Sequence, residues 1–209
     1  MHNKALIVGI TSDIGKGLSS LLEKNGWEVV GTSSTVQNEK TLKVNLKNSW
    51  EIENFFANVD FYKGWKLVIF LAATMKPIGP FFSLNFDTWE DTLAINATAQ
   101  LQILHGIWNH KNPISPVNVC FFAGGGTNSS FDNYSAYCVS KITLIKMVEL
   151  LASENPTDKF VIIGPGFVKT KIHKETFDAG KLSGSNLEKT QNFYLTEGTS
   201  ILEIFQHVQ

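Results

Sequence analysis

The chain has 209 residues and a formal net charge of -1 at pH 7, a length that suits one compact domain. Hydrophobic residues make up 43% of it and charged residues 18%, which excludes wholesale disorder. The near-neutral balance comes without any cluster of lysine and arginine. It therefore gives no electrostatic basis for binding nucleic acid or a membrane surface.

Two features bear on the location of the protein. The chain opens with a strand-like apolar run, MHNKALIVGI, which has the pattern of neither a signal peptide nor a membrane span. Its two cysteines, Cys120 and Cys138, are too few for a disulfide framework and lack the spacing of metal ligands. We therefore predict a reducing, cytoplasmic location and no metal site.

Short strand-like runs alternate with helical patterns along the chain. Strands are predicted at residues 4–10, 28–32, 41–46, 66–72, 117–123 and 159–164. Helices are predicted at residues 15–26, 49–59, 86–110, 134–155 and 199–209. Several of the strands are continuously apolar, as strands buried on both faces are. This alternation predicts an α/β fold, a parallel sheet with right-handed crossovers and helices on both faces. The polar, aperiodic residues 173–198 are predicted to be a mobile loop or lid over a substrate.

The first predicted strand runs into the glycine-rich turn GITSDIGKG. Gly9 and Gly15 bracket this turn, and Ser12 or Asp13 is a natural N-cap for the helix that follows. The free backbone N–H groups and the dipole at such a helix start favour a phosphate. Because glycine-rich turns occur in many α/β proteins, cofactor binding and a plain turn both remain open on this motif alone.

Tyr137 and Lys141 stand four residues apart in a helical segment, so their side chains share one face of that helix. A phenol has a pKa of about 10, and a neighbouring ammonium is expected to lower that pKa. The pair can therefore act as a general acid and base. On their own, these two residues could equally be a surface pair.

In combination these motifs resemble the short-chain dehydrogenase/reductase family. The family's turn, G-x-x-x-G-x-G, has its counterpart in Gly9, Asp13 and Gly15, with aspartate at the place of the middle glycine. The Y-x-x-x-K signature matches Tyr137 and Lys141. Five such landmarks follow one another in the family's order, which is more specific than any one of them.

The other three landmarks extend the resemblance over about residues 4–172. FLAAT, residues 70–74, stands where the family has an Asn-Asn-Ala-Gly stretch. Asn96 matches the helix asparagine that holds a proton-relay water in the family. PGFVKT, residues 165–170, matches P-G-x-V-x-T, whose threonine holds the nicotinamide carboxamide. Taken singly, Asn96 could be an exposed polar residue and the Pro-Gly pair a strand-ending turn.

The resemblance implies a Rossmann-type, doubly wound parallel sheet in a single three-layer domain of residues 1–209. The chain after Gly166 is short and ends in the helical pattern TSILEIFQHVQ. We therefore expect six strands ordered 3-2-1-4-5-6 and no seventh strand. The two long helices, around residues 86–110 and 133–154, form a common dimer interface in the family, so a homodimer is expected.

The function implied is that of an NAD(P)-dependent oxidoreductase that interconverts a carbonyl and an alcohol on a small substrate. Its expected catalytic residues are Tyr137, Lys141, Asn96 and Thr127. The expected cofactor site is formed by Gly9, Thr11, Ser12, Asp13, Ile14, Gly15, Ser33, Ser34, Asn45, Leu46, Ala72, Ala73, Thr74, Tyr137, Lys141, Pro165, Gly166, Val168 and Thr170.

The end of the second predicted strand indicates which dinucleotide is preferred. NAD-preferring relatives have an acid there that binds the ribose hydroxyls. This chain has VVGTSST instead, in which Ser33 and Ser34 could accept a 2′-phosphate and no carboxylate repels it. NADP is therefore favoured, and NAD remains possible. Asn45 takes the place of an aspartate that the family directs at the adenine amino group.

The resemblance departs at the catalytic serine, which the family places after the fifth strand. The thirteenth and fourteenth residues before Tyr137 are Gly124 and Ala123, and neither has a hydroxyl. The run Gly124–Gly126 is either a flexible turn or a set of backbone donors for the substrate oxygen. Thr127, Ser129 and Ser130 lie further along this loop and could reach inward, and Thr127 is the candidate for the missing hydroxyl. Its replacement by alanine is predicted to lower turnover without changing the affinity for NADPH.

Two rival functions remain open. The missing serine and the altered FLAAT segment would also suit a relative that binds a dinucleotide and acts as a sensor or scaffold without catalysis. FLAAT further resembles the sugar-nucleotide epimerase branch of the superfamily. The chain is too short for the usual substrate domain of that branch, so this third function ranks lowest.

Overall fold

The computed structural model describes residues 3–196 and 198–208. Six parallel strands form one sheet in the order β3-β2-β1-β4-β5-β6. The strands are β1 (Asn3–Val8), β2 (Trp27–Ser33), β3 (Thr41–Lys43), β4 (Trp65–Phe70), β5 (Asn118–Phe122) and β6 (Lys159–Ile163). The predicted strand order is confirmed, and the described residues contain no seventh strand. β3 ends at Lys43, three residues before its predicted end.

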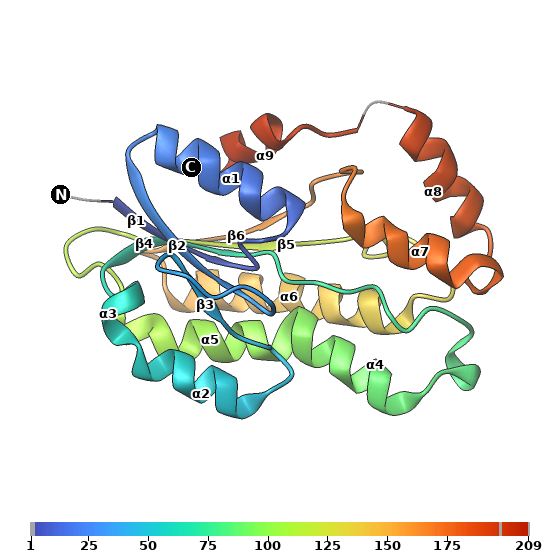
Figure 1. The fold of residues 1–209 in the computed structure, drawn as a ribbon, viewed down its shortest axis with the longest axis horizontal. Helices are drawn as coiled ribbons and strands as arrows, with labels where there is room; N and C mark the ends of the chain where they lie inside the picture. Colours follow the sequence, from blue (N-terminus) through green and yellow to red (C-terminus); the bar gives the residue numbers. More distant parts are fainter. Residues whose placement is uncertain (1–2, 197, 209) are drawn as a thin grey trace.

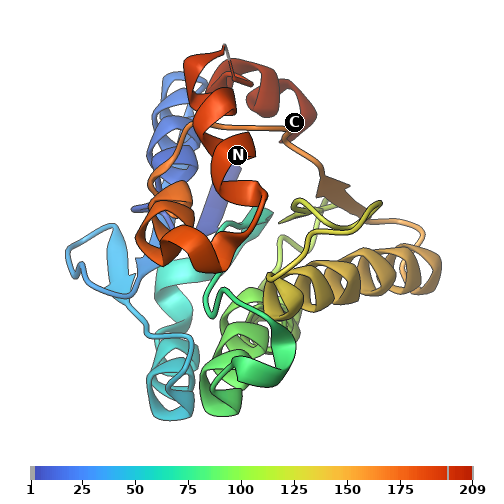
Figure 2. The ribbon, with the colours of Figure 1, turned by 90° about the vertical axis from the view of Figure 1, so that its right-hand side faces the viewer.

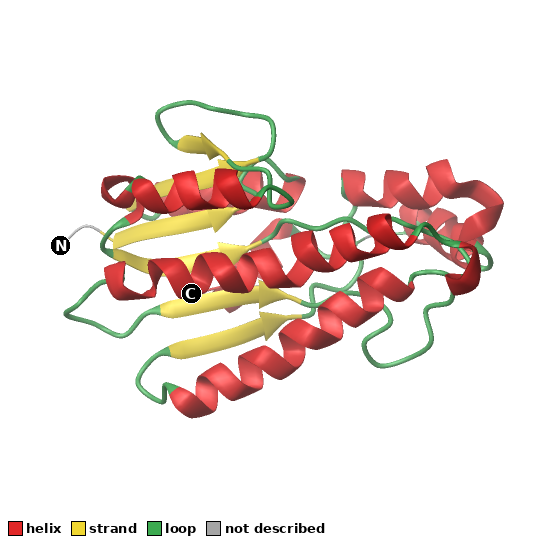
Figure 3. Cartoon of the chain, turned by 90° about the horizontal axis from the view of Figure 1, so that it is seen from below, coloured by secondary structure: helices red, strands yellow, loops and turns green. Residues whose placement is uncertain are grey.

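Helices cover both faces of the sheet (Figures 1 and 2). They are α1 (Asp13–Lys24), α2 (Ser49–Ala57), α3 (Val59–Tyr62), α4 (Phe86–Leu93), α5 (Ala99–Ile107), α6 (Ser135–Glu154), α7 (Lys174–Ala179), α8 (Asn186–Leu195) and α9 (Ile201–Val208). α1 and α9 lie on one face, and α2, α4, α5 and α6 lie on the other. α7 and α8 lie beyond the carboxyl ends of the strands, to which the arrows point in Figure 3.

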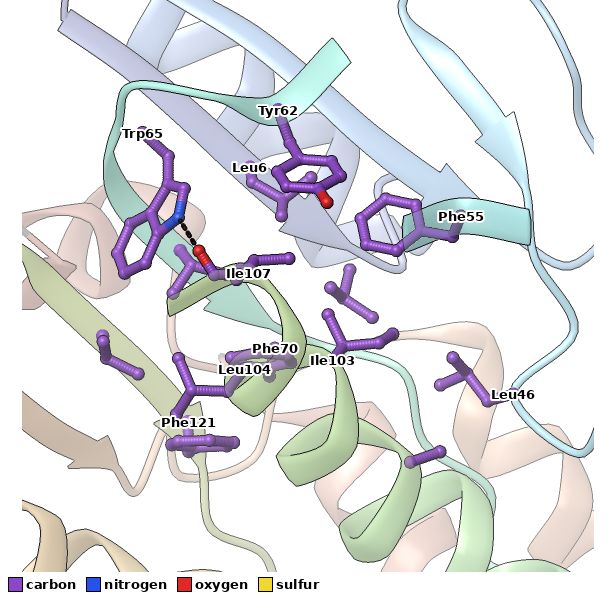
Figure 4. Packing of buried hydrophobic residues seen from close by; sticks show 14 of the residues in the cluster. Leu6, Leu46, Phe55, Tyr62, Trp65, Phe70, Ile103, Leu104, Ile107 and Phe121 are labelled. Atoms are coloured by element: carbon purple, nitrogen blue, oxygen red, sulfur yellow. Dashed lines mark hydrogen bonds between the residues drawn. The ribbon is translucent and has the colours of Figure 1, made fainter. Parts of the chain in front are cut away.

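Each face of the sheet has its own apolar core. The larger core joins the sheet to α2, α5 and α6, and Trp65, Tyr62, Phe55 and Phe121 are among its largest buried side chains. Trp65 is fully buried, and its indole N–H donates to the carbonyl of Ile107 at 3.2 Å (Figure 4). This bond satisfies the one polar atom that the ring brings into the core.

α1 begins where the sequence predicted a helix start. Ser12 is its N-cap, and the Ser12 hydroxyl accepts the Gly15 N–H at 3.0 Å. Leu18 and Leu22, one turn apart, are buried against the sheet. The apolar stripe and the cap therefore fix α1 with its N-terminus at the carboxyl end of β1.

The long helix predicted at residues 86–110 is interrupted. A π-helical turn at Ala94–Thr98 joins α4 to α5, and a short 3-10 turn follows α5. The inserted residue lets the fully buried Asn96 side chain face the loop after β4, where it makes hydrogen bonds with Thr74. Single π turns of this kind occur often at functional sites.

Residues 173–198 differ from the predicted loop. Much of this segment is helical, formed by α7, a 3-10 turn at Gly180–Ser183, and α8. Buried hydrogen bonds tie it to the rest of the chain: Tyr134 donates to the Thr176 hydroxyl at 2.9 Å. Its polar sequence conceals this order because these helices bury polar side chains, which a search for apolar periodicity does not detect.

Candidate active site

A cavity of about 980 Å³ lies at the carboxyl ends of the strands, where the turn after β1, the loop after β4 and the segment after β6 meet. Parallel sheets of this kind bind ligands at that edge. Of the residues expected to hold a cofactor, all except Gly15 line this cavity. Of the four expected catalytic residues, Tyr137 and Lys141 line it, and Asn96 and Thr127 do not.

The turn after β1 is closely packed against the loop after β4. Gly9 has a positive φ of 92°, and a Cβ there would lie 2.8 Å from the Ala72 backbone nitrogen. A Cβ on Gly15 would lie 2.6 Å from the Gly9 carbonyl oxygen. Both positions therefore require glycine, and the start of α1 is left open to the cavity.

Asp13, at the place of the family's middle glycine, reaches across the cavity. Its carboxylate accepts a hydrogen bond from the Lys171 backbone N–H at 2.7 Å, between residues 158 positions apart. The Lys171 ammonium lies 3.4 Å from the Thr11 carbonyl oxygen. The first turn and the segment after β6 are thus joined directly.

The end of β2 forms a wall of hydroxyl groups. The Ser33 hydroxyl bonds the Thr11 hydroxyl at 2.9 Å and accepts the backbone N–H groups of Thr35 and Val36 at 3.2 Å each. Ser34 also lines the cavity and is exposed. No carboxylate from this strand end lines the cavity within the described residues.

Tyr137 and Lys141 lie together on α6, facing the cavity, and both are buried. The Lys141 ammonium donates to the carbonyl of Phe122 at 2.9 Å and lies 5.8 Å from the centre of the Tyr137 ring. Burial lowers the pKa of Lys141 to about 8. Burial also raises the pKa of Tyr137 to about 12, and Cys138 and Glu175 act in the same direction. The lowering of the tyrosine pKa expected from Lys141 is therefore wrong: the pKa is raised, and Tyr137 carries its proton at neutral pH.

Asn96 connects the loop after β4 to α6. Its amide oxygen accepts the Thr74 N–H at 2.9 Å, and its amide nitrogen donates to the Thr74 carbonyl at 2.8 Å. The same nitrogen donates to the Ser140 hydroxyl at 3.1 Å, and that hydroxyl donates to the Tyr137 carbonyl at 2.7 Å. Asn96 therefore positions the backbone around Tyr137 from behind the cavity.

The glycine run after β5 is tightly packed. A Cβ on Gly124 would lie 2.1 Å from the Tyr137 hydroxyl oxygen, and a Cβ on Gly126 would lie 2.5 Å from the Cys138 sulfur. The lack of a side chain at Gly124 thus leaves the space that the Tyr137 hydroxyl occupies. Thr127 donates its hydroxyl to the Gly124 carbonyl at 3.2 Å, within the loop itself.

Replacing Gly124 by alanine is expected to destabilise the fold by about 1–3 kcal/mol, because the new methyl group would overlap the Tyr137 ring. Gly125→Ala is the matched control, since its Cβ would meet nothing closer than 3.7 Å. Urea unfolding of the two variants measures the difference in the free energy of unfolding. Equal stabilities would contradict this close contact.

The side of the cavity facing α7 contains residues that sequence reasoning missed. The Glu175 carboxylate accepts the Thr74 hydroxyl at 3.0 Å and the Met75 N–H at 2.6 Å. Phe167 stacks on His173 at 4.3 Å and on Phe193 at 5.0 Å between ring centres. Phe167 lies within the PGFVKT motif and Lys171 directly follows it, and this motif is the one signal that could have identified any of these residues. Glu175, His173 and Phe193 have no such signal.

The described residues contain neither a membrane-spanning helix nor a metal-binding cluster. None of the helices there combines the length and apolarity needed to cross a bilayer. Across those same residues, no group of three or more histidine, cysteine, aspartate and glutamate side chains is placed to hold a metal ion.

The sheet order, the cavity at its carboxyl edge and the glycine turn at the start of α1 define a Rossmann-type dinucleotide-binding fold. The model of the short chain dehydrogenase family matches residues 3–181. The chain therefore belongs to the short chain dehydrogenase family, whose members are oxidoreductases that use a nicotinamide dinucleotide.

Individual relatives agree with this assignment. The chain is 26% identical over 191 residues to 3-oxoacyl-[acyl-carrier-protein] reductase FabG of Vibrio cholerae, which covers 83% of this chain and 77% of that protein. The fold of this chain is similar to that of the YIR035C short chain dehydrogenase/reductase of Saccharomyces cerevisiae, with a TM-score of 0.79 and 18% sequence identity. The match covers 91% of this chain and 81% of that one. A short chain dehydrogenase family protein of Francisella tularensis has a TM-score of 0.78 at 17% identity, with the same coverage.

Proposed function

We propose that the protein is an NADP(H)-dependent enzyme that interconverts a carbonyl and an alcohol on a small substrate. The observation that carries this proposal is the meeting of two separate motifs in one cavity. The glycine turn from the start of the chain and the Tyr137–Lys141 pair from α6 line the same space. Because the two motifs come from different elements and line one cavity, their meeting favours a shared ligand.

The residues present fit a dinucleotide. Gly9 and Gly15 let the turn pack closely against the loop after β4 and against its own backbone, and this places the start of α1 at the cavity, where its backbone N–H groups would face a pyrophosphate. Ser33 and Ser34 would hold the 2′-phosphate, and Val168 would pack at the nicotinamide end. When bound, the nicotinamide would supply or accept the hydride.

Tyr137 would donate the proton to the substrate oxygen. Its pKa of about 12 keeps the phenol protonated at neutral pH, which is the form that carbonyl reduction requires. Lys141, with a pKa of about 8, is predominantly protonated at pH 7 and lies close enough to stabilise the phenolate that forms. Near neutral pH the site is therefore in the protonation state that reduction requires.

The choice of dinucleotide is tested with Ser34→Asp. An aspartate there would repel a 2′-phosphate, so the dissociation constant for NADPH should rise about tenfold or more, while that for NADH changes little. Fluorescence titration of wild type and variant with both dinucleotides measures this. A wild-type protein that binds NADH more tightly than NADPH would contradict the assignment of NADP.

Replacing Glu175 by glutamine is expected to lower the pKa of Tyr137, because the carboxylate is one of the groups that raise it. Alcohol oxidation requires the phenolate, so the rise of its rate with pH should move to lower pH in the variant. Asp178→Asn, which also removes an acid that lines the cavity, is the control. An unchanged pH profile in Glu175→Gln would show that the carboxylate does not act on Tyr137.

The alternative is a catalytically impaired, dinucleotide-binding sensor or scaffold. It is favoured by alanine and glycine at positions 123 and 124, where the family has its serine, and by the use of the Thr127 hydroxyl within its own loop. Saturable binding of NADPH without turnover of any carbonyl would support it. Loss of turnover in Thr127→Ala, with NADPH affinity unchanged, remains the prediction for that residue.

We also propose that the protein forms a homodimer through α4 and α6. The outward faces of these helices carry exposed apolar side chains, namely Phe86, Val139, Ile142 and Leu150. Covering them would remove apolar area from water. Light scattering tests this, and a monomer at micromolar concentration would contradict it.

A further inference from the structure

The aspartate in the cofactor turn creates an electrostatic problem. Asp13 lines the cavity at the start of α1, where the family's pattern has a glycine and where the pyrophosphate of a dinucleotide would lie. A carboxylate at this place would repel the two negative charges of the pyrophosphate. A chain that binds a dinucleotide here therefore needs a compensating group.

The segment after β6 supplies one. The Lys171 backbone N–H donates to the Asp13 carboxylate at 2.7 Å, and its ammonium lies 3.4 Å from the Thr11 carbonyl of the same turn. The backbone bond directs one carboxylate oxygen toward Lys171. Both residues line the cavity, Asp13 from the first turn and Lys171 from the segment that leads into α7.

The position of Lys171 is fixed from a second side as well. Tyr194, on α8, donates its hydroxyl to the carbonyl of Thr170 at 2.9 Å. The backbone at Thr170 and Lys171 is thus held between the first turn and α8. Because its backbone is already held, the lysine loses less conformational entropy on binding a ligand than a lysine in a flexible segment would.

We propose that Lys171 binds the pyrophosphate of the dinucleotide and that Asp13 holds Lys171 in place to do so. This inference rests on the proposed function, because it needs a dinucleotide in the cavity. The Asp13–Lys171 pair, called the clasp below, then joins the turn after β1 to the segment after β6 across the cavity. The positive charge of the lysine offsets the negative charge that the aspartate adds. Since the pyrophosphate is common to NADPH and NADH, Lys171 contributes equally to the binding of both.

The test measures dissociation constants for NADPH and NADH by fluorescence titration. Lys171→Met should weaken the binding of both dinucleotides by about tenfold, because a charge-assisted contact with phosphate is lost. Lys169→Met is the matched control: Lys169 lies in the same segment, is exposed, and does not line the cavity. It should stay within about twofold of wild type.

A second variant tests the pairing itself. Asp13→Asn is measured alone and in the Lys171→Met background, where it removes the charge left uncompensated and should therefore recover more affinity than it adds in wild type. Equal affinity of Lys171→Met and wild type would overturn the role of Lys171, and strictly additive effects of the two substitutions would overturn the clasp. A wild-type protein that binds neither dinucleotide would instead refute the proposed function, and the clasp with it.

Discussion

Replacing Tyr137 by phenylalanine is expected to lower the rate of carbonyl reduction about 10²–10⁴-fold, the usual contribution of a positioned general acid. The substitution removes one oxygen and leaves the ring, which packs against Phe131 and Met75. The dissociation constant for NADPH should therefore stay within about twofold. Steady-state kinetics and fluorescence titration measure the two quantities separately.

Tyr134→Phe is the control for this experiment. Tyr134 is fully buried three residues earlier, and its hydroxyl donates to Thr176 at 2.9 Å without lining the cavity. Its loss should cost stability and leave most of the turnover intact. Turnover retained in Tyr137→Phe would remove the proposed proton donor.

Replacing Lys141 by methionine should abolish turnover and yet make the protein without cofactor more stable. Lys141 is 3% exposed, and its pKa falls from 10.5 to about 8 on folding because burial penalises the charged form. That shift corresponds to a penalty of roughly 3 kcal/mol in the free energy of folding with the lysine protonated. The lost hydrogen bond to Phe122 offsets about 1 kcal/mol, so the variant should gain about 2 kcal/mol at pH 7.

The pH dependence of this gain has a definite sign. Below about pH 8 both folded and unfolded states bind the proton, and the full penalty acts on wild type. Between pH 8 and 10.5 the unfolded state binds more protons, so the stability of wild type rises with pH and approaches that of the variant. Urea unfolding at pH 7 and pH 10 measures this convergence.

Lys146→Met is the matched control for the buried lysine. Lys146 lies on the same helix, is exposed, and pairs with Glu149 at 2.7 Å. Its replacement should leave stability nearly unchanged at both pH values. A Lys141→Met variant that is less stable than wild type at pH 7 would contradict the penalty of burial.

The sheet could be predicted from the sequence because most of its strands are short, continuously apolar runs. Runs such as ALIV and LVIF are apolar at every position, which indicates a strand buried on both faces. The residues around the cavity followed from the resemblance, since the motifs lie at strand ends that a parallel sheet brings to one edge. The first turn, Tyr137 and Thr170 thus meet although they are distant in the chain.

Other parts of the site depend on contacts that no local pattern reports. Glu175 reaches Thr74 across 101 residues, and nothing around it in the sequence suggests a partner. The raised pKa of Tyr137 likewise follows from its burial and from the nearby Cys138 and Glu175, and the Y-x-x-x-K pattern alone does not encode this burial. The sequence predicts Gly124 as part of a flexible turn or of a set of backbone donors, whereas packing requires glycine there to leave room for the Tyr137 hydroxyl.

The most direct test of catalysis without the serine uses NADPH that carries deuterium at the transferable position, incubated with a panel of small ketones and aldehydes. Mass spectrometry of the products measures whether deuterium reaches the former carbonyl carbon. We predict deuterium in at least one alcohol with wild type, and a loss of about 10²–10⁴-fold with Tyr137→Phe. Saturable binding of NADPH with no deuterium transferred to any carbonyl would contradict an oxidoreductase and favour the sensor.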